Sequence, residues 1–289
     1  MNAPAPRRLI RPGTLIIYGV LGLFGVITLL PFLWMLCAAL KTKEEFFASQ
    51  FLPHGHGLFG VAWDQLTLVQ FKRLFTELAL PRALLNSIFL ASVGSVVATL
   101  FCAMGGYGLS KFRFRGRETL TFTILGTVVL PVALLLSPRF ETLFHLGLVN
   151  RYLGVFLPAF APAFGLYLFR QAMLNSVPND ILESARLDGC GEIRIFFQIV
   201  LPIVRPMVSA FLIITFIGLW NDYITPQIIL QSPELQPLSV AITNLKGLHT
   251  DDYGLIMAGT LVSITPVMGL FFLLQREFIS GLTSGAVKG

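Results

Sequence analysis

The side chains that most often carry enzyme or metal chemistry are few in this sequence and lie far apart. No segment matches a nucleophile turn of the Gly-x-Ser-x-Gly type or a Gly-x-x-x-x-Gly-Lys-Ser/Thr phosphate loop. The histidines and cysteines, which are the usual metal ligands, are His54, His56, His145, His249, Cys37, Cys102 and Cys190. Their spacing forms no CxxC pair and no pattern typical of zinc. We therefore predict no catalytic centre, no metal site and no cofactor bound by this chain.

One carboxylate is placed where a charge is costly. Asp222 interrupts an apolar run over residues 206–230. An acidic residue within a membrane-spanning segment is a candidate functional site. At a rise of about 1.5 Å per residue, it lies roughly 20–25 Å along the run, near one edge of a hydrocarbon core about 30 Å thick. Two interpretations stay open: Asn221 and Asp222 line a translocation path, or Asp222 is structural, with Asn221 and Thr225 as polar neighbours.

The segment 176–206 carries the most informative pattern of helix start and stop signals. Ser176 is a suitable cap for a helix, and Pro178 fits a first turn, where no amide donor is needed. Glu183 lies early in this helix, near its positive end. Gly189 predicts the end of the helix, because Gly is the usual residue in a left-handed C-terminal turn.

A second helical pattern follows this turn. An apolar face with the spacing i, i+3, i+4, i+7 is formed by Ile193, Phe196, Phe197 and Val200. Pro202 predicts the end of this second helix, and Pro206 the beginning of the next apolar run. The segment is thus predicted to be a short helix, a tight turn and an amphipathic helix that lies against the membrane, which together form an exposed knob.

The elements that position these residues are apolar helices. The chain is 55% hydrophobic and 12% charged, with a mean hydropathy of +0.76, whereas soluble domains carry about 25% charged residues. Six segments are long and apolar enough to cross a bilayer, namely 12–40, 83–110, 119–138, 152–171, 206–230 and 253–276. We expect an all-α, polytopic membrane protein in which residues 1–289 form a single transmembrane domain.

The distribution of basic residues predicts the orientation. With the N-terminus in the cytoplasm, thirteen of the 21 lysines and arginines fall on inner segments, which are also the shorter ones. The densest cluster is Lys111, Arg113, Arg115 and Arg117. This bias predicts that both termini and the segment 176–206 are cytoplasmic. It also explains the net charge of +6 without a nucleic-acid partner, because the basic residues form no polybasic arm.

Several of these residues resemble a known family. Glu183-Ser184-Ala185, Gly189, Ile199 and Leu201-Pro202, separated by three, nine and one residues, resemble the EAA loop of ABC importer permeases. Ser184 in place of the family's middle Ala is the one departure. Further likenesses point to the carbohydrate (maltose-type) group and its smaller permease subunit. They are Asn86-Ser87, Tyr107 before Lys111-Phe-Arg-Phe-Arg-Gly, Trp220-Asn-Asp, and the terminal Gly281-Leu-Thr-Ser-Gly-Ala-Val-Lys-Gly289.

The resemblance implies a type I ABC importer fold and a set of residues that contact a separate ATPase. In the coupling loop (176–206) these are Glu183, Ser184, Ala185, Asp188, Gly189, Ile199, Leu201 and Pro202. In the C-terminal tail (277–289) they are Gly285, Val287, Lys288 and Gly289. The outer loop 231–252 is similar to one that family members extend toward a binding protein.

The resemblance also implies partners and a function. The partners are a second, homologous permease subunit in a heterodimer, two ATPase subunits that hold ATP and Mg²⁺, a periplasmic or extracellular solute-binding protein, and the bilayer of a bacterial inner membrane. The expected function is a non-catalytic permease subunit that forms half of the translocation path for a sugar or oligosaccharide. A polyol or a glycerol phosphate ester is the alternative solute. An ion-coupled secondary transporter is the rival class, but the internal repeats typical of it are not evident.

Overall fold

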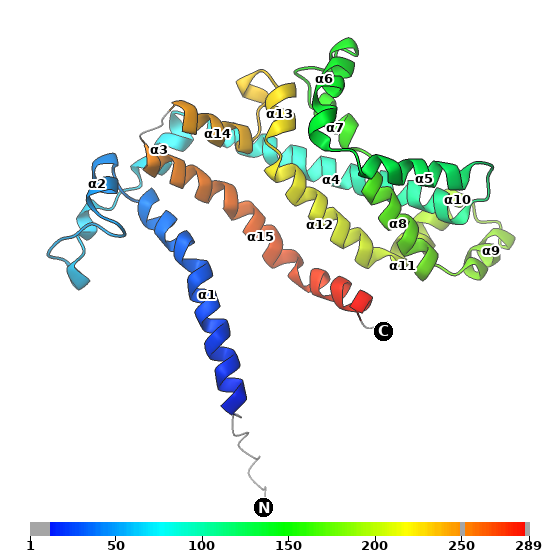
Figure 1. Cartoon of the computed structure of the whole chain (residues 1–289), viewed down its shortest axis with the longest axis horizontal. Helices are drawn as coiled ribbons and strands as arrows, with labels where there is room; N and C mark the ends of the chain where they lie inside the picture. Colours follow the sequence, from blue (N-terminus) through cyan, green and yellow to red (C-terminus); the bar gives the residue numbers. More distant parts are fainter. Residues whose placement is uncertain (1–11, 249–251, 287–289) are drawn as a thin grey trace, which may run out of the picture. The chain divides into compact units, whose positions relative to one another are not determined.

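The computed structural model describes residues 12–248 and 252–286, which are mostly helical. Over these residues there is no strand, and one isolated bridge joins His54 and Val61. The longer helices are α1 (Pro12–Ala39), α4 (Leu80–Lys111), α5 (Arg117–Val128), α6 (Leu136–His145), α8 (Ala163–Ser176), α12 (Arg205–Asn221), α14 (Leu238–Leu248) and α15 (Tyr253–Ala286) (Figure 1). The shorter helices are α2 (Lys43–Ala48), α3 (Val69–Thr76), α7 (Tyr152–Ala159), α9 (Asn179–Leu187), α10 (Glu192–Ile195), α11 (Leu201–Ile203) and α13 (Ile224–Ile229). Single turns are η1 (Leu58–Gly60), η2 (Trp63–Gln65), η3 (Val132–Leu135), η4 (Phe196–Val200, a π turn) and η5 (Pro233–Leu235).

Three helices are long and apolar enough to cross a membrane unaided. They cover Gly13–Ala39, Leu80–Lys111 and Tyr253–Phe272. Three bent pairs also qualify: α5 with η3 and α6 at 100°, α7 with α8 at 44°, and the helices Glu192–Ile203 with α12 at 83°. With each pair counted as one span, the described residues contain up to six spans. The expected all-α, multi-span fold class is therefore confirmed.

Two predicted spans are not continuous, and a proline explains each break. The predicted span 119–138 stops at Val128, and Pro131 is extended (φ −61°, ψ 124°). The predicted span 152–171 is divided between α7 and α8, and Pro162 is extended in the same way (φ −60°, ψ 132°). Proline has no amide hydrogen and disfavours a helical conformation in the residue before it, so it ends a helix even in an apolar run.

The predicted span 206–230 is also interrupted. Helix α12 ends at Asn221, and Asp222 has an extended backbone (φ −66°, ψ 115°). The Asp222 carboxylate accepts a hydrogen bond from the Thr225 amide at 3.1 Å, which stabilises the first turn of the separate helix α13. Asp222 thus lies between two helices rather than inside one.

The chain divides into two compact units. The first contains Met1–Leu78 and Lys246–Val262, and the second contains Ala79–Leu245 and Ser263–Gly289. In the first unit, α1 is apolar around its circumference, and its most hydrophobic stretch buries no residue in this chain. A helix that is hydrophobic on every side is typical of one solvated by lipid or by a partner helix.

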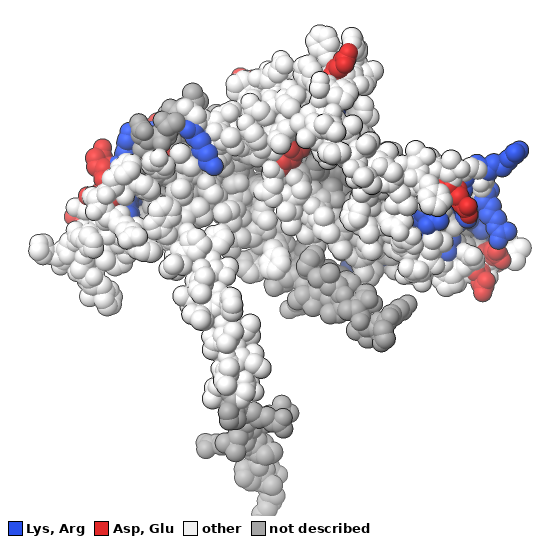
Figure 2. All heavy atoms as spheres, in the orientation of Figure 1, with Lys and Arg blue, Asp and Glu red and all other residues white. Residues whose placement is uncertain are grey.

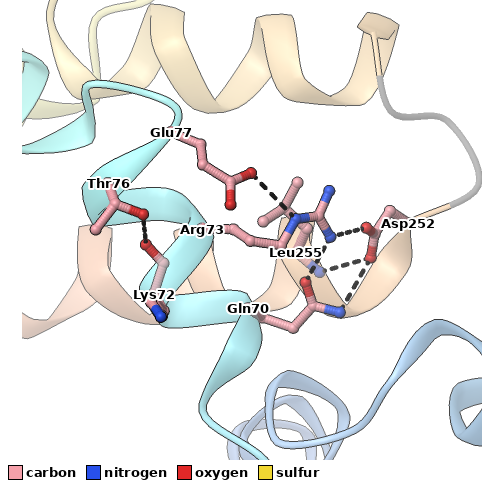
Figure 3. Close-up of polar contacts among 7 residues, drawn as sticks. All are labelled: Gln70, Lys72, Arg73, Thr76, Glu77, Asp252 and Leu255. Carbon is pink, nitrogen blue, oxygen red and sulfur yellow. Dashed lines mark hydrogen bonds and ion pairs between the residues drawn. The ribbon is translucent and has the colours of Figure 1, made fainter.

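A polar cluster stabilises the start of α15 in the first unit (Figure 3). Asp252 caps the helix by accepting a hydrogen bond from the Leu255 amide at 3.2 Å, and it forms an ion pair with Arg73 of α3. Gln70 donates to Asp252 at 3.3 Å and to the Lys41 carbonyl at 3.4 Å. These contacts join residues far apart in the sequence and fix where the last span begins.

In the second unit, α4 packs along both α8 and α12 (Figure 1). Small residues allow the close approach, because a Cβ atom on Gly106 would lie 2.6 Å from Cβ of Phe169 and 2.8 Å from the backbone nitrogen of Arg170. Ala91, Ala98 and Ala103 of α4 are fully buried along the same helix. Small side chains at helix contacts are typical of membrane bundles, where packing rather than water exclusion holds helices together.

Candidate functional site

The first half of the coupling loop is the short helix α9, which ends in a left-handed turn. Gly189 has φ +78°, and the Cys190 and Gly189 amides donate to the carbonyls of Ala185 and Arg186, each at 3.0 Å. This pair of hydrogen bonds is a Schellman motif and satisfies carbonyls at the end of α9. The predicted Gly189 turn is confirmed.

The predicted helix cap at Ser176 is wrong. Ser176 is the last residue of α8, and α9 begins at Asn179 after an extended Pro178 with no side-chain cap. The α8 helix continues up to the proline because nothing before Val177 stops it. The break between α8 and α9 is made by Val177 and Pro178, whose backbones are both extended.

In the second half of the loop, the residues buried within this chain are not the same set as the predicted apolar face. Ile195, Phe196 and Val200 are buried, whereas Ile193 is 75% exposed and Phe197 46% exposed. A π turn covers Phe196–Val200, and Ile193 precedes it in α10. Contact of the apolar face with the membrane stays a prediction. The helix also continues past Pro202 and breaks at Val204 (φ −92°, ψ 14°), two residues after the predicted end.

The predicted coupling residues fall into two groups. Those on the surface are Glu183, Ser184, Asp188, Gly189 and Pro202, and those that are buried or half-buried are Ala185, Ile199 and Leu201. The buried group belongs to an apolar core that joins the loop to α4, α8 and α12. Its fully buried members include Phe169, Met173, Leu182, Ile195 and Val200.

Polar contacts join the loop to the inner end of α4. The Tyr107 hydroxyl donates to Oε2 of Glu192 at 2.7 Å, and Nε of Arg186 donates to Oε1 of the same carboxylate at 2.6 Å. Hydrogen bonding by Arg186 lowers the pKa of Glu192 from its ordinary value, so the carboxylate is charged at neutral pH. Nζ of Lys111 donates to the Val177 carbonyl at 2.6 Å. Tyr107 and Lys111 were noted in the sequence as family likenesses, whereas Glu192 and Arg186 were missed. Nothing in the sequence indicates that Glu192 meets Tyr107 across 85 residues.

The loop presents an apolar surface beside acidic residues. Leu187 is 89% exposed and Ile193 is 75% exposed, and Glu183 and Asp188 are exposed nearby in the chain. In the second unit, charged side chains gather around α9 and α10 (Figure 2). Large apolar side chains that stay exposed next to charged ones are typical of a surface that binds another protein.

Asn221 and Asp222 line a cavity of about 660 Å³. Its walls come from η3, α6, α7, α12 and α13, and they include Arg139 and Thr225. The Asn221 side chain donates to the Ile217 carbonyl at 2.9 Å, and Asp222 accepts the Thr225 amide. Asp222 therefore has the structural role, because it supports the start of α13. It also borders the cavity, and its place on a translocation path stays a prediction.

Side chains at the outer end of α4 hold the segment 230–238. The Asn86 amide donates to the carbonyls of Glu234 at 2.9 Å and Gln236 at 3.0 Å. The Ser87 hydroxyl accepts the Leu238 amide at 2.7 Å, and Nε of Arg82 donates to the Glu234 carbonyl at 3.0 Å. The pair Asn86-Ser87, which the sequence offered only as a family likeness, thus has a structural purpose.

The predicted tail contacts are described only in part. Gly285 lies in α15, whose helix continues to Ala286. Val287, Lys288 and Gly289 lie outside the described residues. Their contact with an ATPase stays a prediction.

Comparison with known proteins places the chain in a family. A family model described as binding-protein-dependent transport system inner membrane component matches residues 95–279. The chain belongs to this family. The match includes the coupling loop and the cavity, and the family is a multi-pass component of the inner membrane.

Individual relatives extend the match over nearly the whole chain. The lactose transport system permease protein LacG of Rhizobium radiobacter is 32% identical over 272 residues, which is 94% of this chain and 95% of that protein. The arabinooligosaccharides transport system permease protein AraQ of Halalkalibacterium halodurans is 36% identical over 225 residues, 78% of this chain and 80% of its own length.

A solved structure supports the fold. A bacterial ABC transporter involved in the import of the acidic polysaccharide alginate aligns with a TM-score of 0.76 at 22% identity, over 96% of this chain and 100% of the matched one. At that level of identity the likeness concerns the fold alone. It agrees with the type I importer fold expected from the sequence.

Proposed function

We propose that this chain is one of two permease subunits of an ABC importer for a sugar or oligosaccharide. It forms half of the translocation path and contains no site of ATP hydrolysis. ATP and Mg²⁺ bind to two separate ATPase subunits, and a solute-binding protein delivers the solute to the outer face.

The observation that carries this proposal is the knob formed by α9, the Gly189 turn and α10. It presents exposed Leu187 and Ile193 beside acidic residues, and the opposite side of the same element is buried in a core shared with α4, α8 and α12. A partner that moves the knob therefore moves packed helices with it, because a close-packed core shifts as a body rather than deforming. This arrangement suits transmission of work from an ATPase to the spans.

The proposed solute class depends on the relatives. LacG and AraQ are named for lactose and for arabinooligosaccharides, and both cover most of this chain. The cavity beside Asn221 and Asp222 is the place in the described part of this subunit where a solute would pass, with Arg139 on its wall. The solute-binding protein selects the solute before the solute reaches this cavity. This subunit therefore needs only a few polar groups on the cavity wall.

Reconstitution tests the proposal. The chain is coexpressed with a second permease, an ATPase and a solute-binding protein from the same genome. Uptake into proteoliposomes is measured with radiolabelled lactose, raffinose, arabinotriose and glycerol 3-phosphate. We expect ATP-dependent uptake of at least one of the three sugars, copurification with the ATPase, and no uptake by the chain alone. Uptake of glycerol 3-phosphate without any sugar would transfer the proposal to the alternative solute class. Transport by the purified chain without an ATPase would overturn it.

A further inference from the structure

We infer that α4 is the rigid link through which the coupling loop and the outer segment 230–238 act on each other. The inference rests on the proposed function, and it concerns two side-chain clusters. The inner cluster consists of Tyr107, Lys111, Asn179, Arg186 and Glu192. The outer cluster consists of Arg82, Asn86, Ser87 and Tyr152, with the backbone of 234–238. The residues of both clusters are positioning residues, since they act through the helix that joins them.

The inner cluster attaches α4 to the coupling loop at two points. Glu192 sits just after the Gly189 turn and receives both Tyr107 from α4 and Arg186 from α9. Lys111, one turn further along α4, donates to the Val177 carbonyl at 2.6 Å and to Oδ1 of Asn179 at 3.0 Å. Ring contact between Tyr107 and Phe196 at 5.7 Å adds an apolar attachment. The loop therefore cannot shift along α4 without breaking charged hydrogen bonds, which are the stronger kind.

The outer cluster attaches the other end of α4 to a loop backbone. Asn86 is only 9% exposed and Ser87 only 2% exposed. Their polar atoms are nevertheless satisfied, because Asn86 donates to two carbonyls of the segment and accepts the Tyr152 hydroxyl at 2.9 Å. Buried polar groups that lose their partners are costly. The segment 234–238 therefore follows α4 when the helix tilts.

The helix between the clusters is uninterrupted. Helix α4 runs from Leu80 to Lys111 without a break, and Asn86 and Tyr107 are separated by roughly 30 Å, or about six turns, at 1.5 Å per residue. By contrast, the path through α12 is bent by 83° near Val204 and ends before Asp222. A continuous, packed helix transmits a tilt over this distance, whereas a path with a bend at one end and an extended residue at the other does not.

This arrangement has a consequence in both directions. Closure of the ATPases displaces the knob, tilts α4 and moves the segment 230–238. Docking of the binding protein on the outer segment tilts α4 in turn and changes the position of the knob. Coupling between two sites in a binding equilibrium is reciprocal, so the same side chains serve both directions.

Hydrogen–deuterium exchange tests the inference without knowledge of the solute. The full complex in lipid nanodiscs is incubated with Mg-ATP and vanadate, which holds the ATPases closed, and exchange is measured in peptides that cover 230–238. In the wild type we expect trapping to change the exchange rate of these peptides at least threefold. In the double variant Tyr107→Phe, Glu192→Gln we expect vanadate trapping to persist and most of that change to disappear. Arg194→Gln is the matched control, since it removes a charge from the same loop but Arg194 bonds to Gln198 within the loop.

A second measurement tests coupling from the outer segment to the ATPases. It also keeps the inference testable if the double variant assembles poorly. Asn86→Ala should retain basal ATPase activity. The increase in ATPase activity caused by the binding protein should be at least five times smaller in this variant than in the wild type. The inference is overturned if the double variant keeps the wild-type exchange change, if the wild type shows none, or if Asn86→Ala is stimulated normally. Failure of the proposed function looks different, because the wild-type complex would then show no ATP-dependent uptake at all.

Discussion

The coupling loop and the outer segment 230–238 are held at opposite ends of α4 by different means. The coupling loop is attached mainly through its own side chains, with Leu182, Ile195 and Val200 in an apolar core and Glu192 between two donors. One backbone contact, from Lys111 to the Val177 carbonyl, adds to these. The outer segment is attached through its backbone, whose atoms bond to Asn86, Ser87 and Arg82. The inner attachment therefore depends on which residues the loop contains, whereas the outer one depends mainly on the path of the chain.

This difference fits the two kinds of partner proposed for the chain. A loop that must move with an ATPase needs a fixed shape, and a buried core supplies it. A segment that faces a solute-binding protein needs side chains that are free to match that protein. Helix α4 holds the second segment by its carbonyls and amides and leaves side chains such as Glu234 exposed.

The largest expected effect comes from filling the close contact near the inner end of α4. In Gly106→Val the new Cβ would meet Phe169 and the backbone of Arg170 at less than 3 Å. Backbone atoms cannot rotate away, so we expect a loss near the upper end of the 1–3 kcal/mol typical of overpacking. The melting temperature of the purified complex, followed by fluorescence-detected size exclusion, measures it. Gly108→Ala is the control, because nothing lies within 4 Å of its Cβ position, and an equal loss there would contradict the packing argument.

The second largest effect comes from a substitution that changes the backbone shape of the coupling loop without changing its packing. Nothing lies within 4 Å of a Cβ on Gly189, but its φ of +78° disfavours any side chain. Gly189→Val should cost about 1–2 kcal/mol and reduce ATP-dependent uptake strongly, because the knob must change shape. Gly189→Asn should keep much more activity, since Asn tolerates a left-handed backbone. Uptake and basal ATPase rates measured side by side check this, and equal activity of both variants would contradict the prediction.

The inner attachment could be predicted from sequence in outline. The turn at Gly189 was predicted because glycine is the residue type that most easily adopts a positive φ. The fold class was predicted because a helix that crosses a bilayer needs a long apolar run. Helix breaks were missed where composition stayed apolar, although Pro131 and Pro162 were visible in the sequence. Mean hydropathy over a window reports how favourably side chains transfer into lipid. It does not show that a proline lacks the amide donor that a continuous helix needs.

Contacts between distant residues could not be predicted. Glu192 meets Tyr107 from 85 positions away, and Asn86 meets Glu234 from 148 away. Such pairs arise from helix packing, which the pattern along one chain does not encode. The burial of Ile195 beside Phe196 and Val200 was also missed, because a 3.6-residue period does not show which apolar side chains other helices cover.

A smaller effect shows whether the outer segment 230–238 is held by its backbone or by its side chains. Asn86→Ala removes the donors to two carbonyls and should destabilise the outer segment by about 1 kcal/mol, since water replaces part of the bonding near a membrane surface. Glu234→Ala removes an exposed side chain whose backbone carbonyl alone is used, and should leave the segment in place. Deuterium exchange over 232–238 in the resting complex compares the two. Faster exchange in Glu234→Ala than in Asn86→Ala would contradict attachment through the backbone.

The smallest expected effect is the pH dependence of the two clusters. Hydrogen bonding by Arg186 lowers the pKa of Glu192, so the stability from their ion pair is fully present above the ordinary glutamate pKa of about 4.5 and is lost only as the pH falls through the lowered value. Both partners are partly exposed, so the contribution itself is small. The outer residues Asn86 and Ser87 bond through an amide and a hydroxyl, which carry no charge.

Between about pH 6 and pH 8, the ratio of stimulated to basal ATPase activity should therefore vary in parallel for the wild type and for Glu192→Gln. A pH step present in the wild type and absent in Glu192→Gln would show that the pKa of Glu192 lies in that range and that Arg186 does not hold it charged. Parallel curves would instead place any pH dependence of transport outside the contacts of α4, in the partner subunits or on the wall of the cavity.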